Sequence, residues 1–327
     1  MKFLKVIYFL LAFAVVSISV IAFGSHSYFN SQSVYKDKFF IVNKGDNFHK
    51  ITINLVKENI IQEKDRKLFY YISKIIYKNN IKIRAGEYFF LNGETPLNII
   101  NKLKKGDVFF RKITFAEGLS NDSMLKLIDS APGLIGNLPS EEVVEGTLLP
   151  ETYLYTAGET KRELIIRMQK AMVEFFNKEW ENRAPNLPFK TKTEALNLAS
   201  IVEKETGVPE ERGMVASVFI NRVRNGWKLD SDPTVVYAFT NGNKDLERPI
   251  RKSDLQRISE YNTYVIQGIP SKAIANPGKD SIKAVLNPKQ TDYLFFVATG
   301  NGGHNFSKTL EEHNKFVEEY RNKVGGK

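Results

Sequence analysis

The chain has 327 residues, of which 42% are hydrophobic and 26% charged, so it can hold one large domain with a buried core and a smaller second domain. The absence of cysteine excludes disulfide bonds and thiolate metal sites. The formal charge of +10 favours an acidic partner, and composition leaves this partner open among nucleic acid, an anionic membrane surface and an acidic cell-wall polymer.

The first predicted element is an apolar run, residues 6–23, which carries no charge and is just long enough to span a bilayer. Lysines precede it and no charge follows before Lys36, so the N-terminus is expected in the cytoplasm and the rest of the chain outside. A cleaved signal peptide is the alternative, because small residues lie near Gly24. We favour an uncleaved anchor, residues 1–24, since the run exceeds the usual apolar core of roughly 7–15 residues. Either alternative exports the chain and disfavours nucleic acid as a partner.

A polar stretch without periodicity follows, and we expect residues 25–37 to form a tether. The pattern then predicts a strand at 39–42, a turn, and a helix with apolar residues at helical spacing, a unit that resembles the opening of a LysM-type sugar-binding module. Further elements are predicted as helix 68–77, strand 84–90, helix 96–105 capped by Thr95 and ended by Gly106, and strand 107–114. We therefore expect a LysM-like α+β module at 38–110, with an approximate boundary near Arg111.

The remaining residues, 111–327, are predicted to form a larger α+β domain. An amphipathic helix at 162–180 has apolar residues at core spacing and is expected to be scaffold. The loops before it carry acids beside glycine or proline, which are usually turn formers; Glu151 is the one we retain as a candidate ligand contact.

Two acids lie in the next predicted helix, residues 193–206, which Gly207 and Pro209 follow. On a helical wheel Glu205 shares the apolar face with Leu198 and Ile201, whereas Lys204 and Asn197 lie on the opposite side. Burial and the negative end of the helix dipole both raise a carboxyl pKa, as a general acid at neutral pH requires. A buried acid in a structural ion pair is the alternative. Glu203 lies elsewhere on the wheel and is the weaker candidate.

The helix after Pro209 places Arg222 on its apolar stripe, where the side chain either pairs with an acid or contacts substrate. Residues 230–234, 261–264, 268–270 and 275–278 are predicted loops, followed by a helix at 280–286 and a strand at 293–298. Tyr, Asn and Thr clustered on loops suit carbohydrate, although ordinary turn chemistry also uses them. Thr309 and Glu312 form a predicted capping box.

Other chemistry is disfavoured by the sequence, since it has no HExxH, GxSxG or phosphate-binding glycine motif. His304 could line a pocket and His313 is expected to pack or cap. A metal site would need distant acids, so no metal and no cofactor are expected.

Seven motifs together resemble the YceG-like family, in the same order along the chain: residues 199–206, 215–222, 232–234, 261–264, 268–270, 275–278 and 302–304. This resemblance implies cleavage of the MurNAc–GlcNAc bond in nascent glycan strands, 1,6-anhydroMurNAc ends and a role as terminase. It places the catalytic acid at Glu205. The residues expected to bind substrate are Glu151, Asn221, Arg222, Asp232, Thr234, Tyr261, Asn262, Thr263, Tyr264 and His304.

The implied partners are peptidoglycan strands and the bacterial inner membrane, with the catalytic domain extracytoplasmic and peptidoglycan synthases as a further candidate partner. One acid suffices for such a reaction, because the C6 hydroxyl of the substrate replaces water as the attacking group. Two alternatives remain: a membrane-anchored protein that binds peptidoglycan without cleaving it, and a muramidase that uses water.

Overall fold

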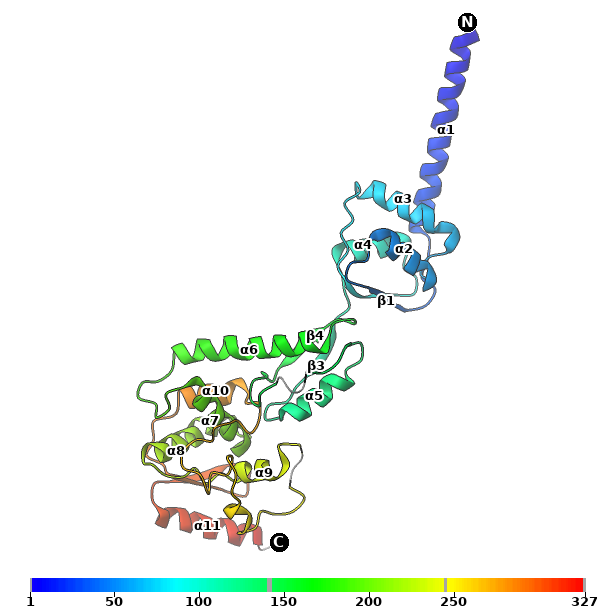
Figure 1. Ribbon diagram of the computed structural model, residues 1–327. Helices are drawn as coiled ribbons and strands as arrows, with labels where there is room; N and C mark the ends of the chain where they lie inside the picture. Colours follow the sequence, from blue (N-terminus) through cyan, green and yellow to red (C-terminus); the bar gives the residue numbers. More distant parts are fainter. Residues whose placement is uncertain (1, 140–142, 244–245, 326–327) are drawn as a thin grey trace. The chain divides into compact units, whose positions relative to one another are not determined.

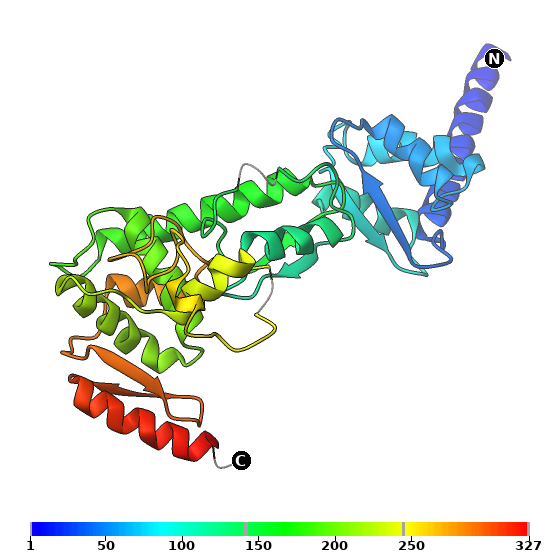
Figure 2. The ribbon, with the colours of Figure 1, turned by 60° about the horizontal axis from the view of Figure 1, so that its bottom comes forward.

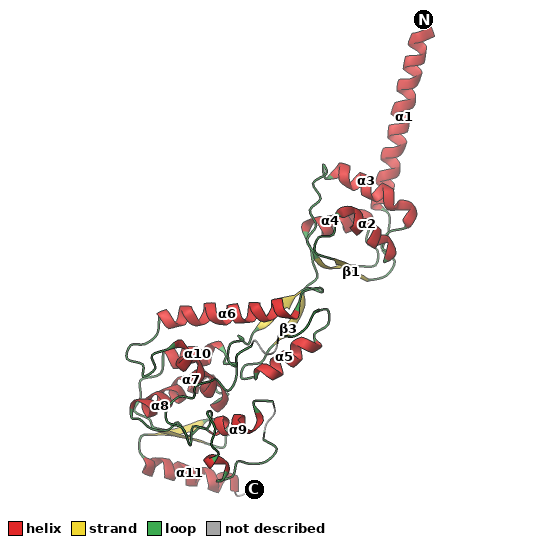
Figure 3. Ribbon diagram, viewed as in Figure 1, coloured by secondary structure: helices red, strands yellow, loops and turns green. Residues whose placement is uncertain are grey.

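The computed structural model describes residues 2–139, 143–243 and 246–325 (Figure 1). The chain forms two compact units. Unit 1 contains Met1–Arg111 together with Pro132–Ile135 and Leu154–Glu159, and unit 2 contains Lys112–Ala131, Gly136–Tyr153 and Thr160–Lys327. Helices and strands occur in both units (Figure 3), so the prediction of an α+β fold is confirmed. The LysM-like nature of the module stays a prediction.

The N-terminal helix α1 is longer than the sequence pattern suggested. It runs over Lys2–Asn30, and within the described residues it alone is long and apolar enough to cross a membrane, over Phe3–Asn30. Met1, the first residue of the predicted anchor, lies outside the described residues. The tether prediction is wrong as far as Asn30, because no helix breaker follows Gly24 and Phe29 is buried in unit 1, with its ring stacked 6.0 Å from that of Phe69.

Unit 1 has one antiparallel pair of strands, in which Lys38 faces Phe90 and Val42 faces Gly86. Side chains alternate across the sheet, so Phe40 and Phe90 are buried in the core. Both predicted caps of α4 are confirmed. The Thr95 side chain accepts a hydrogen bond from the backbone N–H of Asn98, and Gly106 ends the helix in the left-handed conformation. The elements are β1 (Lys38–Val42), α2 (Phe48–Lys57), η1 (Glu63–Asp65), α3 (Arg66–Ile76), β2 (Gly86–Phe90) and α4 (Pro96–Lys105).

The second two-stranded sheet joins β3 (Arg111–Thr114) to β4 (Thr152–Tyr155), and the division between the units falls within both strands. The strand predicted at 107–114 begins only at Arg111 and is shorter than expected. The remaining elements are α5 (Asn121–Ser130), α6 (Lys161–Glu181), α7 (Lys192–Glu205), η3 (Pro209–Glu211), α8 (Arg212–Arg224), α9 (Asp232–Thr240), η4 (Asp254–Gln256), α10 (Lys279–Leu286), β5 (Phe295–Ala298), β6 (His304–Ser307) and α11 (Leu310–Gly325).

Helix α7 lies in the core of unit 2 and packs against α8, α9 and α10. It begins with a capping box between Thr191 and Glu194, and Leu198 and Ile201 are fully buried. The antiparallel hairpin of β5 and β6 lies between α8 and α11 (Figure 2), where the ring of Phe296 meets that of Phe219 edge to face at 5.7 Å. The C-terminal hairpin and helix are thus built onto the helix that follows α7.

Two sequence predictions in unit 2 are corrected by the structure. Asn197, expected on the solvent side, is buried because its side-chain amide donates to the carbonyl of Pro270 at 2.8 Å. The predicted loop 230–234 is helical from Asp232, since an acid and a proline at the first positions favour a helix start. The second strand of the C-terminal hairpin, β6, was not predicted.

Candidate functional site

Glu205 is the last residue of α7, at the point where the chain leaves the helix in an extended conformation at Thr206. Its Oε1 accepts a hydrogen bond of 2.5 Å from the Ser231 hydroxyl. The residue keeps part of its surface accessible while protein surrounds its carboxyl group. Burial raises the pKa of Glu205 to about 7; the Ser231 hydrogen bond opposes this rise, and the charge of Asp232 adds to it. A carboxyl group with this pKa is partly protonated at neutral pH.

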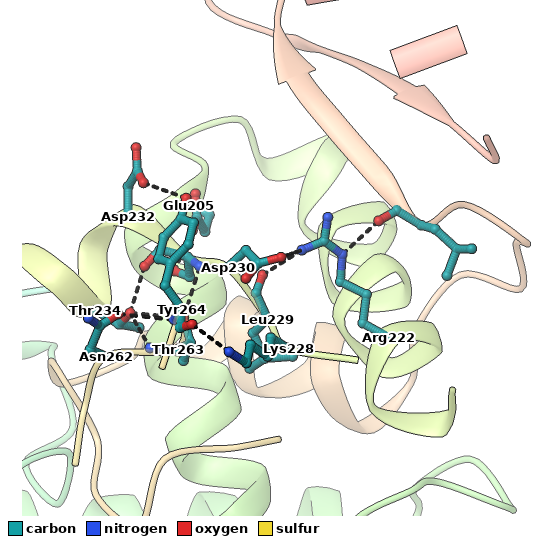
Figure 4. Close-up of polar contacts among 12 residues, drawn as sticks. Glu205, Arg222, Lys228, Leu229, Asp230, Asp232, Thr234, Asn262, Thr263 and Tyr264 are labelled. Carbon is teal, nitrogen blue, oxygen red and sulfur yellow. Dashed lines mark hydrogen bonds and ion pairs between the residues drawn. The ribbon is translucent and has the colours of Figure 1, made fainter. Parts of the chain in front are cut away.

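A cavity of about 360 Å³ opens beside Glu205. Glu205, Asp230 and Asp232 supply acidic groups, and Tyr264 and Arg222 complete the polar wall. Aromatic and aliphatic side chains form the other wall: Leu229, Phe295, Phe296 and Leu310, with His313 beside them. Figure 4 shows Glu205, Asp232 and Tyr264 gathered at one end of this polar group and Arg222 at the other. A cavity lined by both polar and aromatic side chains is suited to a sugar ring, which has hydroxyl groups at its edge and apolar faces.

Asp232 lies in the first turn of α9 and accepts a hydrogen bond of 2.8 Å from the Tyr264 hydroxyl. The backbone of Tyr264 is itself fixed, because its N–H donates to Asn262 Oδ1 at 3.0 Å and its carbonyl accepts from Lys228. Burial and this carboxylate raise the pKa of the Tyr264 hydroxyl, so Tyr264 remains a donor at neutral pH. The loop at 261–264 therefore helps to orient Asp232 beside Glu205.

A buried network of hydroxyl groups holds Ser231 in place. The Thr263 hydroxyl accepts from the backbone N–H of Ser231 at 2.9 Å, and the Thr234 hydroxyl donates to the Ser231 carbonyl at 2.6 Å. The two threonine hydroxyls are 2.9 Å apart, and both side chains are fully buried. Thr234, Thr263 and Asn262 thus act as supports; they do not line the cavity.

Arg222 points into the cavity wall from α8. Its Nε donates to the carbonyl of Leu294 at 2.7 Å and its Nη1 to the carbonyl of Leu229 at 2.8 Å, while Asp230 Oδ2 lies 3.4 Å away (Figure 4). Its neighbour Asn221 donates to the carbonyls of Thr291 and Tyr293 and lies outside the cavity. These two residues fasten the segment leading into β5.

Three further residues predicted to bind substrate, in addition to Asn221, Thr234, Asn262 and Thr263, lie away from the cavity. Glu151 is exposed and forms an ion pair with Lys279. His304 pairs with Glu211, its Nδ1 2.7 Å from Oε2. The Tyr261 ring packs against that of Tyr237 at 4.8 Å.

Sequence reasoning missed several residues of the site. Ser231 has the closest contact with Glu205, yet it precedes the Asp-Pro-Thr motif by one residue. Phe295 comes from β5, which contacts α8, and Leu310 and His313 come from α11, which packs on the hairpin, so only tertiary structure places these residues at the cavity. The location of Ser231 between two acids, Asp230 and Asp232, was the one available signal.

Glu203 is buried in a separate cluster. It accepts from the backbone N–H of Gly278 at 2.8 Å and from Arg212 Nη2 at 3.4 Å. Arg212 also lies 3.3 Å from Glu117, so one guanidinium joins two carboxylates. These contacts favour a structural role for Glu203.

A second cavity, of about 610 Å³, meets the first at Asp232, which lines both. Lys204, Ser120, Tyr237 and Asn243 are among its polar residues. Across residues 2–139, 143–243 and 246–325, no group of three or more acidic or histidine side chains could hold a metal ion.

A carboxylic acid with a pKa near neutrality, beside a second acid in a cavity that aromatic side chains also line, defines a candidate general acid–base site. The family model of the YceG-like family matches residues 40–319. The chain belongs to this family.

Relatives with curated names and a solved structure are similar to this chain. The endolytic murein transglycosylase of Bacillus subtilis is 32% identical over 300 residues, covering 82% of this chain and 80% of that protein. A protein of the same name from Streptococcus pneumoniae is 25% identical over 85% of this chain, which spans 57% of that relative. The 2.6 Å crystal structure of a yceG-like protein from Listeria monocytogenes has a TM-score of 0.52 and 27% identity, covering 86% of this chain and 98% of that one.

Proposed function

We propose that this chain is an endolytic lytic transglycosylase of peptidoglycan, with Glu205 as its catalytic acid and base. The observation that carries the proposal is the Glu205 carboxyl, whose pKa of about 7 leaves it able to donate a proton at neutral pH. Family membership and the names of the relatives support the same reaction.

One carboxyl group, which first donates a proton and then accepts one, is sufficient for the reaction. Glu205 donates its proton to the oxygen of the leaving sugar as the bond from MurNAc C1 to that oxygen breaks. The resulting carboxylate then takes the proton of the C6 hydroxyl on the same MurNAc, whose oxygen bonds to C1. No water is consumed, the product end is 1,6-anhydroMurNAc, and Glu205 regains its proton.

The residues around Glu205 have distinct proposed roles. Asp232 is available to accept hydrogen bonds from sugar hydroxyls, and Tyr264 holds it in position. The aromatic wall of Phe295 and Phe296 would pack against the apolar face of a sugar ring. Because the second cavity also contains Asp232, we assign it to sugars further along the strand.

Helix α1 supports a location at the membrane. Its length and composition fit a single-pass anchor with a cytoplasmic N-terminus, which would leave unit 2 extracytoplasmic. An enzyme held there would act on strands as they are made, as a terminase beside peptidoglycan synthases.

A water-using muramidase is the second candidate, and Asp232 favours it. Hydrolysis of a glycosidic bond ordinarily needs a second carboxylate, and Asp232 lines the same cavity as Glu205. The two reactions differ by one water molecule in the mass of the product end.

The test is mass spectrometry of products released from uncrosslinked glycan strands by the purified chain and by Glu205→Gln. We expect anhydro ends from the wild type and a loss of at least about 10²-fold in the variant, which has neither the acid nor the base. Glu174→Gln, an exposed acid on α6, is the matched control. Reducing ends would establish the muramidase, and near-normal turnover by Glu205→Gln would remove this residue from the reaction.

A further inference from the structure

The outer face of α3, formed by Lys67, Tyr71, Lys74 and Ile75, combines apolar and basic side chains, and exposed Lys78 lies two residues beyond the end of the helix. Tyr71 is 61% exposed and Ile75 is 71% exposed, which is costly for side chains of this size. On an ideal helix these four positions fall within about 100° of one another. The opposite side of the helix carries Phe69 and Ser73, which are buried in unit 1.

The charge on and after this helix has one sign. No acidic residue occurs between Arg66 and Gly86, and the preceding Glu63 is paired with Arg66 at 3.0 Å. Lysines that flank an exposed tyrosine and isoleucine have the composition of a helix that lies in the interface of an anionic membrane. An aromatic ring with a polar tip suits the same layer.

The distance between unit 1 and the membrane follows from the length of α1 beyond its apolar run. Its apolar run ends at Phe23, and Phe29, six residues further on, is already buried in the core of unit 1. At about 1.5 Å per helical residue this separation is about 9 Å. The headgroup layer on each side of a bilayer is roughly 5–8 Å thick. Unit 1 therefore lies against the headgroups if α1 spans the membrane.

Contacts within unit 1 identify the face that meets the headgroups. Helix α3 packs against α1, with Phe69 stacked on Phe29. Figures 1 and 3 show α3 across the end of unit 1 from which α1 emerges, and β1 at the opposite end. The outer face of α3 thus points to the side on which the bilayer would lie.

We propose that the outer face of α3 docks on the surface of the anionic membrane that α1 spans. The docking rests on the proposed anchoring by α1. Tyr71 and Ile75 enter the layer between headgroups and acyl chains, and Lys67 and Lys74 contact lipid phosphates. The contact fixes unit 1 against the bilayer at a second point, in addition to α1.

The absence of cysteine allows a direct test with single labels. Ile75→Cys and the matched Ile41→Cys, which is exposed on β1, are each made in the full chain, labelled with an environment-sensitive fluorophore and reconstituted into vesicles containing one-third anionic lipid. Quenching by lipids that carry a nitroxide near the headgroup is expected to be about twofold or more greater at position 75 than at 41. The difference is expected to shrink in zwitterionic vesicles.

A label at Ile18→Cys, in the middle of α1, separates the anchoring by α1 from the docking of α3. A lipid-embedded label at 18 with equal quenching at 75 and 41 overturns the docking alone. A water-exposed label at 18 overturns both the anchor and the docking. Neither outcome depends on enzymatic activity, so a failure of the proposed reaction would be recognised separately.

Discussion

At the residue scale, the proton of Glu205 is controlled by opposing contacts. Burial raises the pKa, the hydroxyl of Ser231 stabilises the charged form, and the negative charge of Asp232 disfavours it. A general acid must be protonated before the reaction, so activity is expected to decline as pH rises through this pKa.

This decline is the alkaline limb of the pH–activity profile, and the pH at which it occurs is predicted to move in opposite directions in two variants. Ser231→Ala removes a hydrogen bond to the carboxylate, which raises the pKa of Glu205 and shifts the limb to higher pH. Asp232→Asn removes a nearby negative charge, which lowers the pKa and shifts the limb to lower pH. The pH dependence of kcat/KM measures both shifts, and Ser130→Ala, exposed at the end of α5, should leave the limb in place. Shifts of the same sign in the two variants would contradict the assignment.

Protonation of Glu205 also links stability to pH. The unfolded chain ionises this group near its ordinary pKa of about 4.3, whereas the folded chain ionises it near 7. The contribution of protonated Glu205 to stability is therefore fully present below about pH 4.3 and is lost as pH rises through about 7. Glu205→Gln carries no such penalty, so relative to the wild type it should gain up to about 4 kcal/mol above pH 8 and nothing near pH 4.

Urea unfolding at pH 5 and pH 8 checks this linkage. The gain of Glu205→Gln should be larger at pH 8, while Glu174→Gln, an exposed acid, should show no such trend. A difference between wild type and Glu205→Gln that is the same at both pH values would mean that the folded chain does not raise this pKa.

At the element scale, α10 is fixed against α7 at Gly278. The N–H of this residue donates to Glu203, and a Cβ placed on it would lie 1.9 Å from Glu117 Oε1. Gly278→Ala is therefore predicted to destabilise unit 2 by about 1–3 kcal/mol, as overpacking does. Thermal unfolding measures the loss.

Two comparisons isolate the steric cause. Gly207→Ala, where nothing lies within 4 Å of the added atom, should leave the melting temperature nearly unchanged. Adding Glu117→Ala to Gly278→Ala should recover part of the loss, because it removes the clashing carboxylate. No recovery would show that the alanine acts through the backbone.

The same elements show what sequence could and could not predict. Helical periodicity placed Glu205 on a buried face, and the structure confirms that protein surrounds its carboxyl group, because this depends on neighbours three and four residues away. Asn197 was misplaced, since its burial depends on Pro270, which is distant in sequence. Ser231 and the C-terminal wall of the cavity also depend on such contacts. The catalytic role of Glu205 stays a prediction until it is measured.

At the scale of the whole molecule, the polar segment predicted to separate the anchor from unit 1 belongs to the fold of unit 1. Residues 25–37 are polar on average, yet Phe29 and Val34 are only 4% and 1% exposed in the core of unit 1. Backbone hydrogen bonds also attach this segment to unit 1: the N–H of Val34 donates to the carbonyl of Glu94, and the carbonyl of Val34 accepts from the N–H of Gly93. The predicted tether thus contributes to folding, because two apolar residues in a polar segment suffice to dock it.

Two truncations should therefore behave differently. A chain that begins at residue 25 keeps Phe29 and Val34, whereas one that begins at residue 38 loses both and should have a unit 1 less stable by at least about 3 kcal/mol. Thermal unfolding is expected to show an earlier first transition only in the shorter chain, and Phe29→Ala in the longer chain should reproduce part of the loss. Cleavage of soluble glycan strands should be similar in both, because every residue that lines the Glu205 cavity belongs to unit 2. Equal melting of the two chains would show that the segment is a tether after all.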